Sequence, residues 1–214
     1  MSEKNISCMK KINEAIRLNQ FDDLSNLEEV WVFGYGSLIW RPVFRYSEKI
    51  VGKIRGFHRR FYQSDMTYRG TPEFPARVAT LLKDPTAEAE TYGCAFKLSG
   101  KNEISAGIKY LHTREVEKAG YSVTVEEFHS CESPPIPALV YTATTENYYF
   151  TGKQSMEELS DIIANASGLA GPNTEYLFRL AEWQREFLPL VEDDHLYELT
   201  RMTKEKISKI ESEN

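Results

Sequence analysis

Glu115 occupies the apolar face of a predicted helix, where a charged side chain is unexpected. The sequence predicts a helix over Asn102–Lys118, whose buried face carries apolar residues at i, i+4 and i+7: Ile104, Ile108 and Leu111. At about 100° per residue, the step from Ile104 to Glu115 returns to within roughly 20° of that face. Burial disfavours the charged form of a carboxyl group and raises its pKa. This position therefore predicts a general base or acid.

Three alternatives remain for this carboxyl group. It could form an ion pair with an arginine such as Arg77, or the apolar stripe could end before it. His112 lies three residues earlier and could share a metal ion with it, although no third ligand is in view. Arg114 falls on a neighbouring face and is predicted to be a solvated or structural cation. Glu117 is rotated by about 200° from Glu115 and is expected to lie in solvent, so it is the weaker candidate for catalysis.

A second candidate site is the glycine turn at Gly34–Leu38, which follows a predicted buried strand over Val30–Phe33. Glycines let the backbone approach a ligand closely, and successive N–H groups can point into one concavity. Such a turn suits a carboxylate or a developing oxyanion, and Ser37 adds a hydroxyl donor. The alternative is a turn with no further role. A dinucleotide site is not indicated, because the third glycine of that fingerprint would fall at Ile39.

Four arginines fall within one predicted strand–loop–strand region: Arg59, Arg60, Arg69 and Arg77. A substrate with a free carboxylate could pair with one of them. The alternative for each is a solvated or ion-paired surface side chain. The loop between the strands, Ser64–Pro75, is long enough to take part in function.

Composition excludes several classes of function. The chain of 214 residues has 26 Lys and Arg against 32 Asp and Glu, a net charge of −6, which is not typical of proteins that bind nucleic acids or anionic membranes. No stretch approaches the roughly 18 apolar residues of a membrane helix. The three cysteines, Cys8, Cys94 and Cys131, form no CxxC pair, and the four histidines are scattered. A cytoplasmic protein without disulfides or a zinc site is therefore expected.

The elements that must position these residues follow a mixed α/β pattern. Strands are predicted over Val30–Phe33, Arg60–Gln63, Arg77–Leu82, Tyr92–Leu98, Tyr121–Phe128 and Ala138–Thr144. Besides Asn102–Lys118, helices are predicted over Ser155–Ala166, Thr174–Leu188 and Asp193–Ile210. Residues 1–28 form an N-terminal extension in which Met9, Ile12 and Ile16 predict a short amphipathic helix. The expected fold is α+β, a small core sheet able to close into a barrel and surrounded by helices.

Several runs of this sequence resemble the ChaC family of γ-glutamylcyclotransferases, which act on glutathione. Two of them, VWVFGYGSLIW and RRFYQ, are similar to the family's first strand and its RRFWQ, and lie at Val30–Trp40 and Arg59–Gln63. The runs that resemble RGTP…GRVATL lie at Arg69–Pro72 and Arg77–Leu81. Those that resemble YLxxRE…GGY lie at Tyr110–Glu115 and Gly120–Tyr121, and those that resemble GxNxEYL and EHL at Gly171–Leu177 and Asp194–Leu196. In order and spacing the resemblance covers about residues 29–207.

The resemblance implies a γ-glutamylcyclotransferase-like fold and a specific reaction. The implied catalytic acid/base is Glu115, which agrees with its predicted place on the helix. The implied binding turn for the γ-glutamyl group consists of Val32, Phe33, Gly34, Tyr35, Gly36, Ser37 and Leu38. The expected reaction cyclises the γ-glutamyl group of glutathione to give 5-oxoproline and Cys-Gly, without a metal, nucleotide or other cofactor. The expected organisation is the extension at 1–28, the enzyme domain at 29–207 and a charged tail at 208–214, in a monomer or weak dimer.

The chain departs from the family pattern at four positions: Thr67, Tyr68, Ala76 and Lys153. The family often has Asp, His, Gly and Pro there, so these positions bear on which leaving group is accepted. Three other functions stay open. One is the same cyclisation on other γ-glutamyl amino acids or amines. Another is a regulatory protein that binds the γ-glutamyl group without catalysis, and the most remote is a nicotinamide-dependent oxidoreductase.

Overall fold

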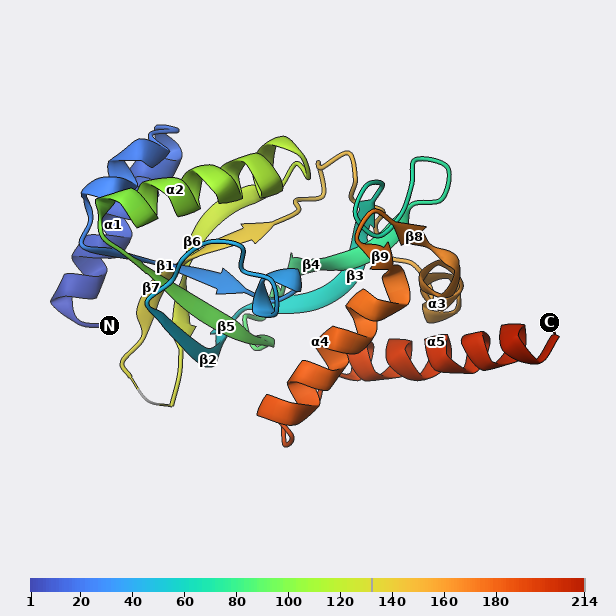
Figure 1. Ribbon diagram of the computed structural model, residues 1–214. Coiled ribbons are helices and arrows are strands. Elements are labelled where there is room, and N and C mark those ends of the chain that lie inside the picture. Colours follow the sequence, from blue (N-terminus) through green and yellow to red (C-terminus); the bar gives the residue numbers. More distant parts are fainter. Residues whose placement is uncertain (132, 214) are drawn as a thin grey trace. The chain divides into compact units, whose positions relative to one another are not determined.

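The computed structural model describes residues 1–131 and 133–213, which divide into two units (Figure 1). The first unit comprises residues 1–58 and 81–147, and the second comprises 59–80 and 148–214. Strands β3 (Phe57–Asp65) and β4 (Ala76–Lys83) pair as a two-stranded sheet, and each has residues in both units. The expected domain at 29–207 therefore contributes to both units. The last residue of the expected tail at 208–214 lies outside the described residues.

Five strands of the first unit form a closed barrel in the order β1-β5-β2-β6-β7. They are β1 (Glu29–Gly34), β2 (Glu48–Arg55), β5 (Glu90–Ser99), β6 (Ser122–His129) and β7 (Ile136–Thr142). The neighbours within this order are antiparallel. A parallel pairing of β1 with β7 closes the barrel, and it sets Val32 opposite Leu139 and Phe33 opposite Val140. The predicted barrel-like mixed sheet is confirmed.

Large apolar side chains fill the core around the barrel. Six of them are less than 2% exposed: Phe33, Ile54, Phe96, Leu98, Phe128 and Leu139. The rings of Phe33 and Phe128 lie 5.8 Å apart, within the range of a favourable aromatic pair. Burial of this kind supplies the main favourable free energy of folding.

Strand β2 is the main element that the sequence analysis missed. Charged residues dominate its sequence, EKIVGKIR, and only Gly52 and Ile54 are fully buried. The strand forms because it pairs with β5 along its whole length and with β6 at Lys53 and Ile54. Partners so distant in the sequence leave no local pattern. The predicted strands occur with shifted ends, and β7 ends at Thr142 rather than Thr144.

Helices α1 (Glu3–Arg17) and α2 (Lys101–Leu111) cover the barrel in Figure 1, with the short 3₁₀ helix η1 (Phe21–Asn26) packed against α2. Helix α1 packs on β6 and β7. Gly107 allows α2 to approach β5 closely, because a Cβ atom there would lie 2.1 Å from Cδ2 of Leu98. The helix predicted over Asn102–Lys118 is not uniform. Its α-helical part ends at Leu111 and continues as a π-helix, η3 (His112–Glu117).

The second unit contains three helices, α3 (Met156–Asn165), α4 (Asn173–Phe187) and α5 (Asp194–Glu213), and a short hairpin of β8 (Ser167–Gly168) and β9 (Gly171–Pro172). Both α3 and α4 pack against α5. The predicted capping box starts α3: the Ser155 hydroxyl accepts from the N–H of Glu158, whose carboxylate accepts from the N–H of Ser155. Within the described ranges, no helix has the length and apolar character to cross a membrane.

His195 is held neutral at the start of α5. Its Nε2 accepts a hydrogen bond from the backbone N–H of Phe61, 3.3 Å away, so this nitrogen carries no proton. Burial, together with the positive charge of Arg60, lowers the pKa of His195 to about 4. Protonation of His195 would therefore cost both this hydrogen bond and the folded arrangement around it.

Acid is expected to destabilise the protein through His195. In the unfolded chain this imidazole binds a proton near pH 6.5, and in the folded chain only near pH 4. Stability that is present above pH 6.5 is therefore lost as the pH falls toward 4. Urea unfolding across this range should show a loss roughly 2 kcal/mol larger for the wild type than for His195→Gln, whose amide oxygen can accept the same bond. Equal losses in the two proteins would contradict this assignment.

Candidate active site

The turn after β1 is tightly folded. It passes through Tyr35 and Gly36 into a 3₁₀ turn, η2 (Ser37–Ile39), in which the N–H of Ile39 donates to the carbonyl of Gly36 at 3.0 Å. A Cβ atom on Gly34 would lie 2.7 Å from Cβ of Leu38 and 3.3 Å from the ring of Phe96. Glycine at position 34 therefore lets the chain fold back on itself directly after the strand.

Most of the predicted binding run is buried. Val32 and Phe33 belong to the barrel wall at 0% and 1% exposed, and Tyr35 and Leu38 are buried as well. Ser37 is the residue of the run that is partly exposed. The N–H groups at the start of a helical turn have no acceptor within it, so the amides of Ser37 and Leu38 are suited to a ligand.

Tyr35 fixes the turn to β7, the strand that pairs with β1 to close the barrel. Its side chain is 6% exposed, and its hydroxyl donates to the backbone carbonyl of Tyr141 on β7 at 2.7 Å. The parallel register that sets Phe33 opposite Val140 brings Tyr141 beside the end of β1. The turn is thus held by the strand pairing at the end of β1 and by the hydrogen bond of the Tyr35 side chain.

Glu115 lies in the π-helix and is 8% exposed, so its predicted burial is confirmed. The wider turn is marked by an i to i+5 hydrogen bond from the N–H of Lys118 to the carbonyl of Thr113, 3.3 Å long. The carbonyl of Glu115 accepts from the N–H of Tyr121 at 2.8 Å. The backbone on both sides of this carboxyl group is therefore fixed.

Arg114 joins the turn to the buried carboxylate. Its Nε lies 3.2 Å from Oε1 of Glu115, and its Nη2 donates to Oγ of Ser37 at 2.5 Å. Its side chain is 19% exposed, so of the two roles that the sequence left open, a solvated or a structural cation, the structure favours the structural one. The ion pair with an arginine that the sequence left open for Glu115 is thus formed with Arg114, its neighbour in the chain. A guanidinium beside a carboxylate favours the charged form, which opposes the rise in pKa expected from burial.

Tyr141 is another titratable side chain that interacts with Glu115. It is 3% exposed. Burial raises the pKa of its phenol well above the usual range, and the negative charge of Glu115 raises it further. The phenol is therefore neutral at physiological pH. Pairing of β7 with β1 places this residue, and that long-range pairing could not be found from the sequence.

The arginines of the predicted cluster form contacts inside the second unit. Arg59 pairs with Asp193 at 2.7 Å, and Arg69 pairs with Glu175 at 2.7 Å. Arg77 donates to Oε1 of Gln154 at 2.7 Å and to the carbonyls of Pro75 and Ala76. Asn173, 0% exposed, bonds both the N–H and the carbonyl of Arg77. These contacts join β3, β4 and the loop between them to the helices of the same unit.

The structure offers little for a metal ion. Over residues 1–131 and 133–213, no three His, Cys, Asp or Glu side chains are grouped so that they could hold one. His112, considered above as a residue that could share a metal ion with Glu115, packs against Phe21 of η1 with its ring tilted by 48° and the ring centroids 4.9 Å apart. The N-terminal extension thereby supports the π-helix.

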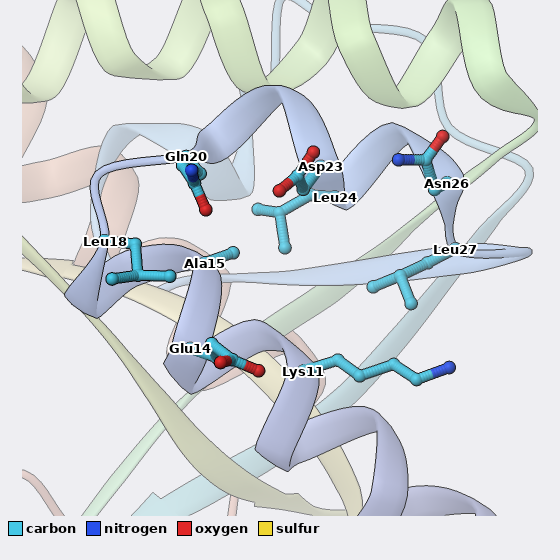
Figure 2. A pocket seen from close by; sticks show the side chains of 9 residues that line it. All are labelled: Lys11, Glu14, Ala15, Leu18, Gln20, Asp23, Leu24, Asn26 and Leu27. Atoms are coloured by element: carbon cyan, nitrogen blue, oxygen red, sulfur yellow. The ribbon is translucent and has the colours of Figure 1, made fainter.

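A pocket of about 290 Å³ lies in the N-terminal extension (Figure 2). Figure 2 shows that its walls come from α1 and the η1 segment, with Lys11, Glu14 and Asp23 among its charged lining residues. It contains no residue of the glycine turn or of the π-helix. The candidate active site is therefore defined by the turn, Arg114 and Glu115.

Comparisons with known proteins show to which family the chain belongs. The model of the ChaC-like protein family matches residues 30–206. The chain is 40% identical over 180 residues to a zebrafish (Danio rerio) protein named glutathione-specific gamma-glutamylcyclotransferase 1, covering 83% of this chain and 90% of that protein. It is also 40% identical to the human protein of the same name, covering 79% of this chain and 76% of the human one.

A solved structure has a similar fold. It is the crystal structure of a γ-glutamyl cyclotransferase from yeast described as specific to glutathione. The TM-score is 0.73 at 26% identity, and the match covers 84% of this chain and 97% of the yeast chain.

Removal of the Tyr35 hydroxyl is expected to destabilise the protein. Tyr35→Phe leaves the buried carbonyl of Tyr141 without this donor, which should lower the free energy of unfolding by about 1 kcal/mol. Tyr46→Phe is the matched control, because Tyr46 is 45% exposed and should change stability by less than about 0.5 kcal/mol. Urea unfolding of both variants measures the difference. Equal stability of the two would show that this bond does not hold the turn.

Proposed function

Because the chain belongs to the ChaC-like family, we propose that it cleaves glutathione by cyclising the γ-glutamyl group, releasing 5-oxoproline and Cys-Gly. The names of its relatives support glutathione as the substrate. The observation that carries the proposal is that Arg114 contacts both the buried carboxylate of Glu115 and Ser37 of the glycine turn. The candidate base and the candidate binding turn thus lie in the same unit, and the side chain of Arg114 contacts both.

The chemistry needs a base and little else. The α-amine of the γ-glutamyl group attacks its own γ-carbonyl carbon, a C–N bond forms in a five-membered ring, and the amide bond to cysteine breaks. Ring closure is intramolecular, so correct positioning supplies much of the rate. An ammonium group cannot attack, so its proton must first be removed. We assign this step to Glu115, which then gives the proton to the leaving amine of Cys-Gly.

The glycine turn is assigned the binding role. Val32 and Phe33 form its base in the barrel wall, and Gly34 allows the close fold that follows. Amides of the Tyr35–Leu38 segment and the Ser37 hydroxyl are the donors for the γ-glutamyl group and for the oxyanion of the tetrahedral intermediate. The site has the donors before the reaction starts, which is what stabilises charge as it develops.

Glu115→Gln is expected to abolish turnover while the fold is kept. Glutamine has the size of glutamate but cannot take a proton from the substrate ammonium, so kcat should fall by about 100-fold or more. Glu117→Gln is the matched control, because Glu117 lies on the same π-helix and is exposed. Purified protein is incubated with glutathione, and 5-oxoproline and Cys-Gly are quantified.

The wild type and Glu117→Gln should release the two products in equal amounts. Full activity of Glu115→Gln would overturn the assignment of this residue. Binding of glutathione to the wild type without either product would favour a regulatory binding protein.

Glutathione is expected to be preferred over other γ-glutamyl compounds. The relatives named for glutathione carry this expectation, and the departures at Thr67, Tyr68, Ala76 and Lys153 make it worth testing. We expect kcat/KM for glutathione to exceed that for γ-glutamyl-alanine by about tenfold or more. Both substrates share the group that is cyclised and differ only in the leaving group, so this ratio measures selection for Cys-Gly. Equal values would point to a general γ-glutamyl cyclotransferase.

We further expect the enzyme to act in the cytoplasm as a monomer or weak dimer. Three free thiols, Cys8, Cys94 and Cys131, support a reducing compartment. Light scattering of the purified protein measures its association state.

A further inference from the structure

We propose that Arg114 is a positioning residue, which holds Glu115 as the ionised base and turns the Ser37 hydroxyl toward the substrate. The inference rests on the proposed function and adds a residue to it. The basis is the pair of contacts from one guanidinium, to Oε1 of Glu115 at 3.2 Å and to Oγ of Ser37 at 2.5 Å.

The bond to Ser37 determines where the serine hydrogen points. A guanidinium has only donors, so Oγ of Ser37 is the acceptor in this bond. The hydroxyl therefore keeps its own hydrogen for another acceptor. Ser37 is the partly exposed residue of an otherwise buried turn, so an oxygen of the γ-glutamyl group is the acceptor that we assign.

The contact with Glu115 opposes the effect of burial. Burial at 8% exposure favours the neutral acid, and a neutral acid cannot accept a proton from the substrate. The positive charge of Arg114 favours the carboxylate, which is the form that starts the reaction. Tyr141, on strand β7, is another titratable group that interacts with Glu115, and its raised pKa keeps the phenol uncharged.

The π-helix makes this arrangement possible. Residues 114 and 115 are adjacent in the chain, and on an α-helix adjacent side chains diverge by about 100°. In the wider turn of η3 both side chains are largely buried, at 19% and 11% exposed, and they contact each other. Arginine is suited to two simultaneous contacts because its planar fork presents several donors in fixed directions.

The test compares Arg114→Gln with Arg114→Lys. Glutamine removes the charge, so the acidic limb of the pH profile of kcat/KM should move to higher pH by about one unit or more. At neutral pH, kcat should fall by about 10- to 100-fold. Lysine keeps the charge and should restore the acidic limb, but a point charge cannot serve both partners, so kcat should stay low. Lys118→Gln removes an exposed cation near Glu115 and is the control, expected to behave as the wild type.

A titration of Glu115 itself separates this inference from the proposed function. Carbon NMR of glutamate-labelled protein, assigned with Glu115→Gln, measures the carboxyl group in the wild type and in Arg114→Gln without any turnover. A rise of the Glu115 pKa by about one unit or more in Arg114→Gln supports the inference. An unchanged value, or an unmoved acidic limb in a folded Arg114→Gln protein, would overturn it and leave Arg114 a structural role. Absence of 5-oxoproline from the wild type would instead defeat the proposed function.

A double-variant cycle tests the contact with Ser37. If Arg114 acts through this hydroxyl, the losses in kcat/KM for Ser37→Ala and Arg114→Gln should overlap, and the double variant should be less impaired than their product. Losses that multiply would show that Arg114 does not orient Ser37.

Discussion

The parallel pairing of β1 with β7 is the constraint on which the candidate site depends. The other strand pairs of the barrel are antiparallel, and this pairing alone joins the two outer strands of that order. It fixes the end of β1, where the glycine turn begins, and it places Tyr141 beside that end. The bond from the Tyr35 hydroxyl to the carbonyl of Tyr141 continues the same connection into the turn. The position of the turn is therefore a property of barrel closure rather than of the turn's own sequence.

Local patterns predicted the parts of the structure that local patterns determine. The burial of Glu115 followed from three apolar residues at helical spacing, and the capping box at Ser155 followed from its own four residues. Strand β2 was not predicted, because its charged sequence forms a strand only through pairing with β5 and β6. The place of Tyr141 at the site was not predicted for the same reason, since only strand pairing brings it there. Sequence analysis thus found the candidate base but not its surroundings.

The contacts of Arg114 were not predicted for a different reason. The prediction assumed a regular α-helix, in which neighbouring residues face different directions. A change to a π-helix after Leu111 alters those directions, and no pattern in the sequence of His112–Glu117 predicts the change. Other residues of the family motifs turned out to build the second unit. Arg69 and Asn173 bond elements of that unit to one another, so their presence in a motif reflects folding as much as chemistry.

The π-helix makes the number of residues, and not only their types, a requirement of the site. A π-turn closes its hydrogen bond over one more residue than an α-turn. One residue fewer between Leu111 and Arg114 would rotate Arg114 and Glu115 together relative to the glycine turn, so both residues would be retained while the contact with Ser37 is lost. Alignments that slide a gap freely through this segment would conceal such a loss. The length of this segment is thus a requirement of the candidate site, beside the identity of its glutamate.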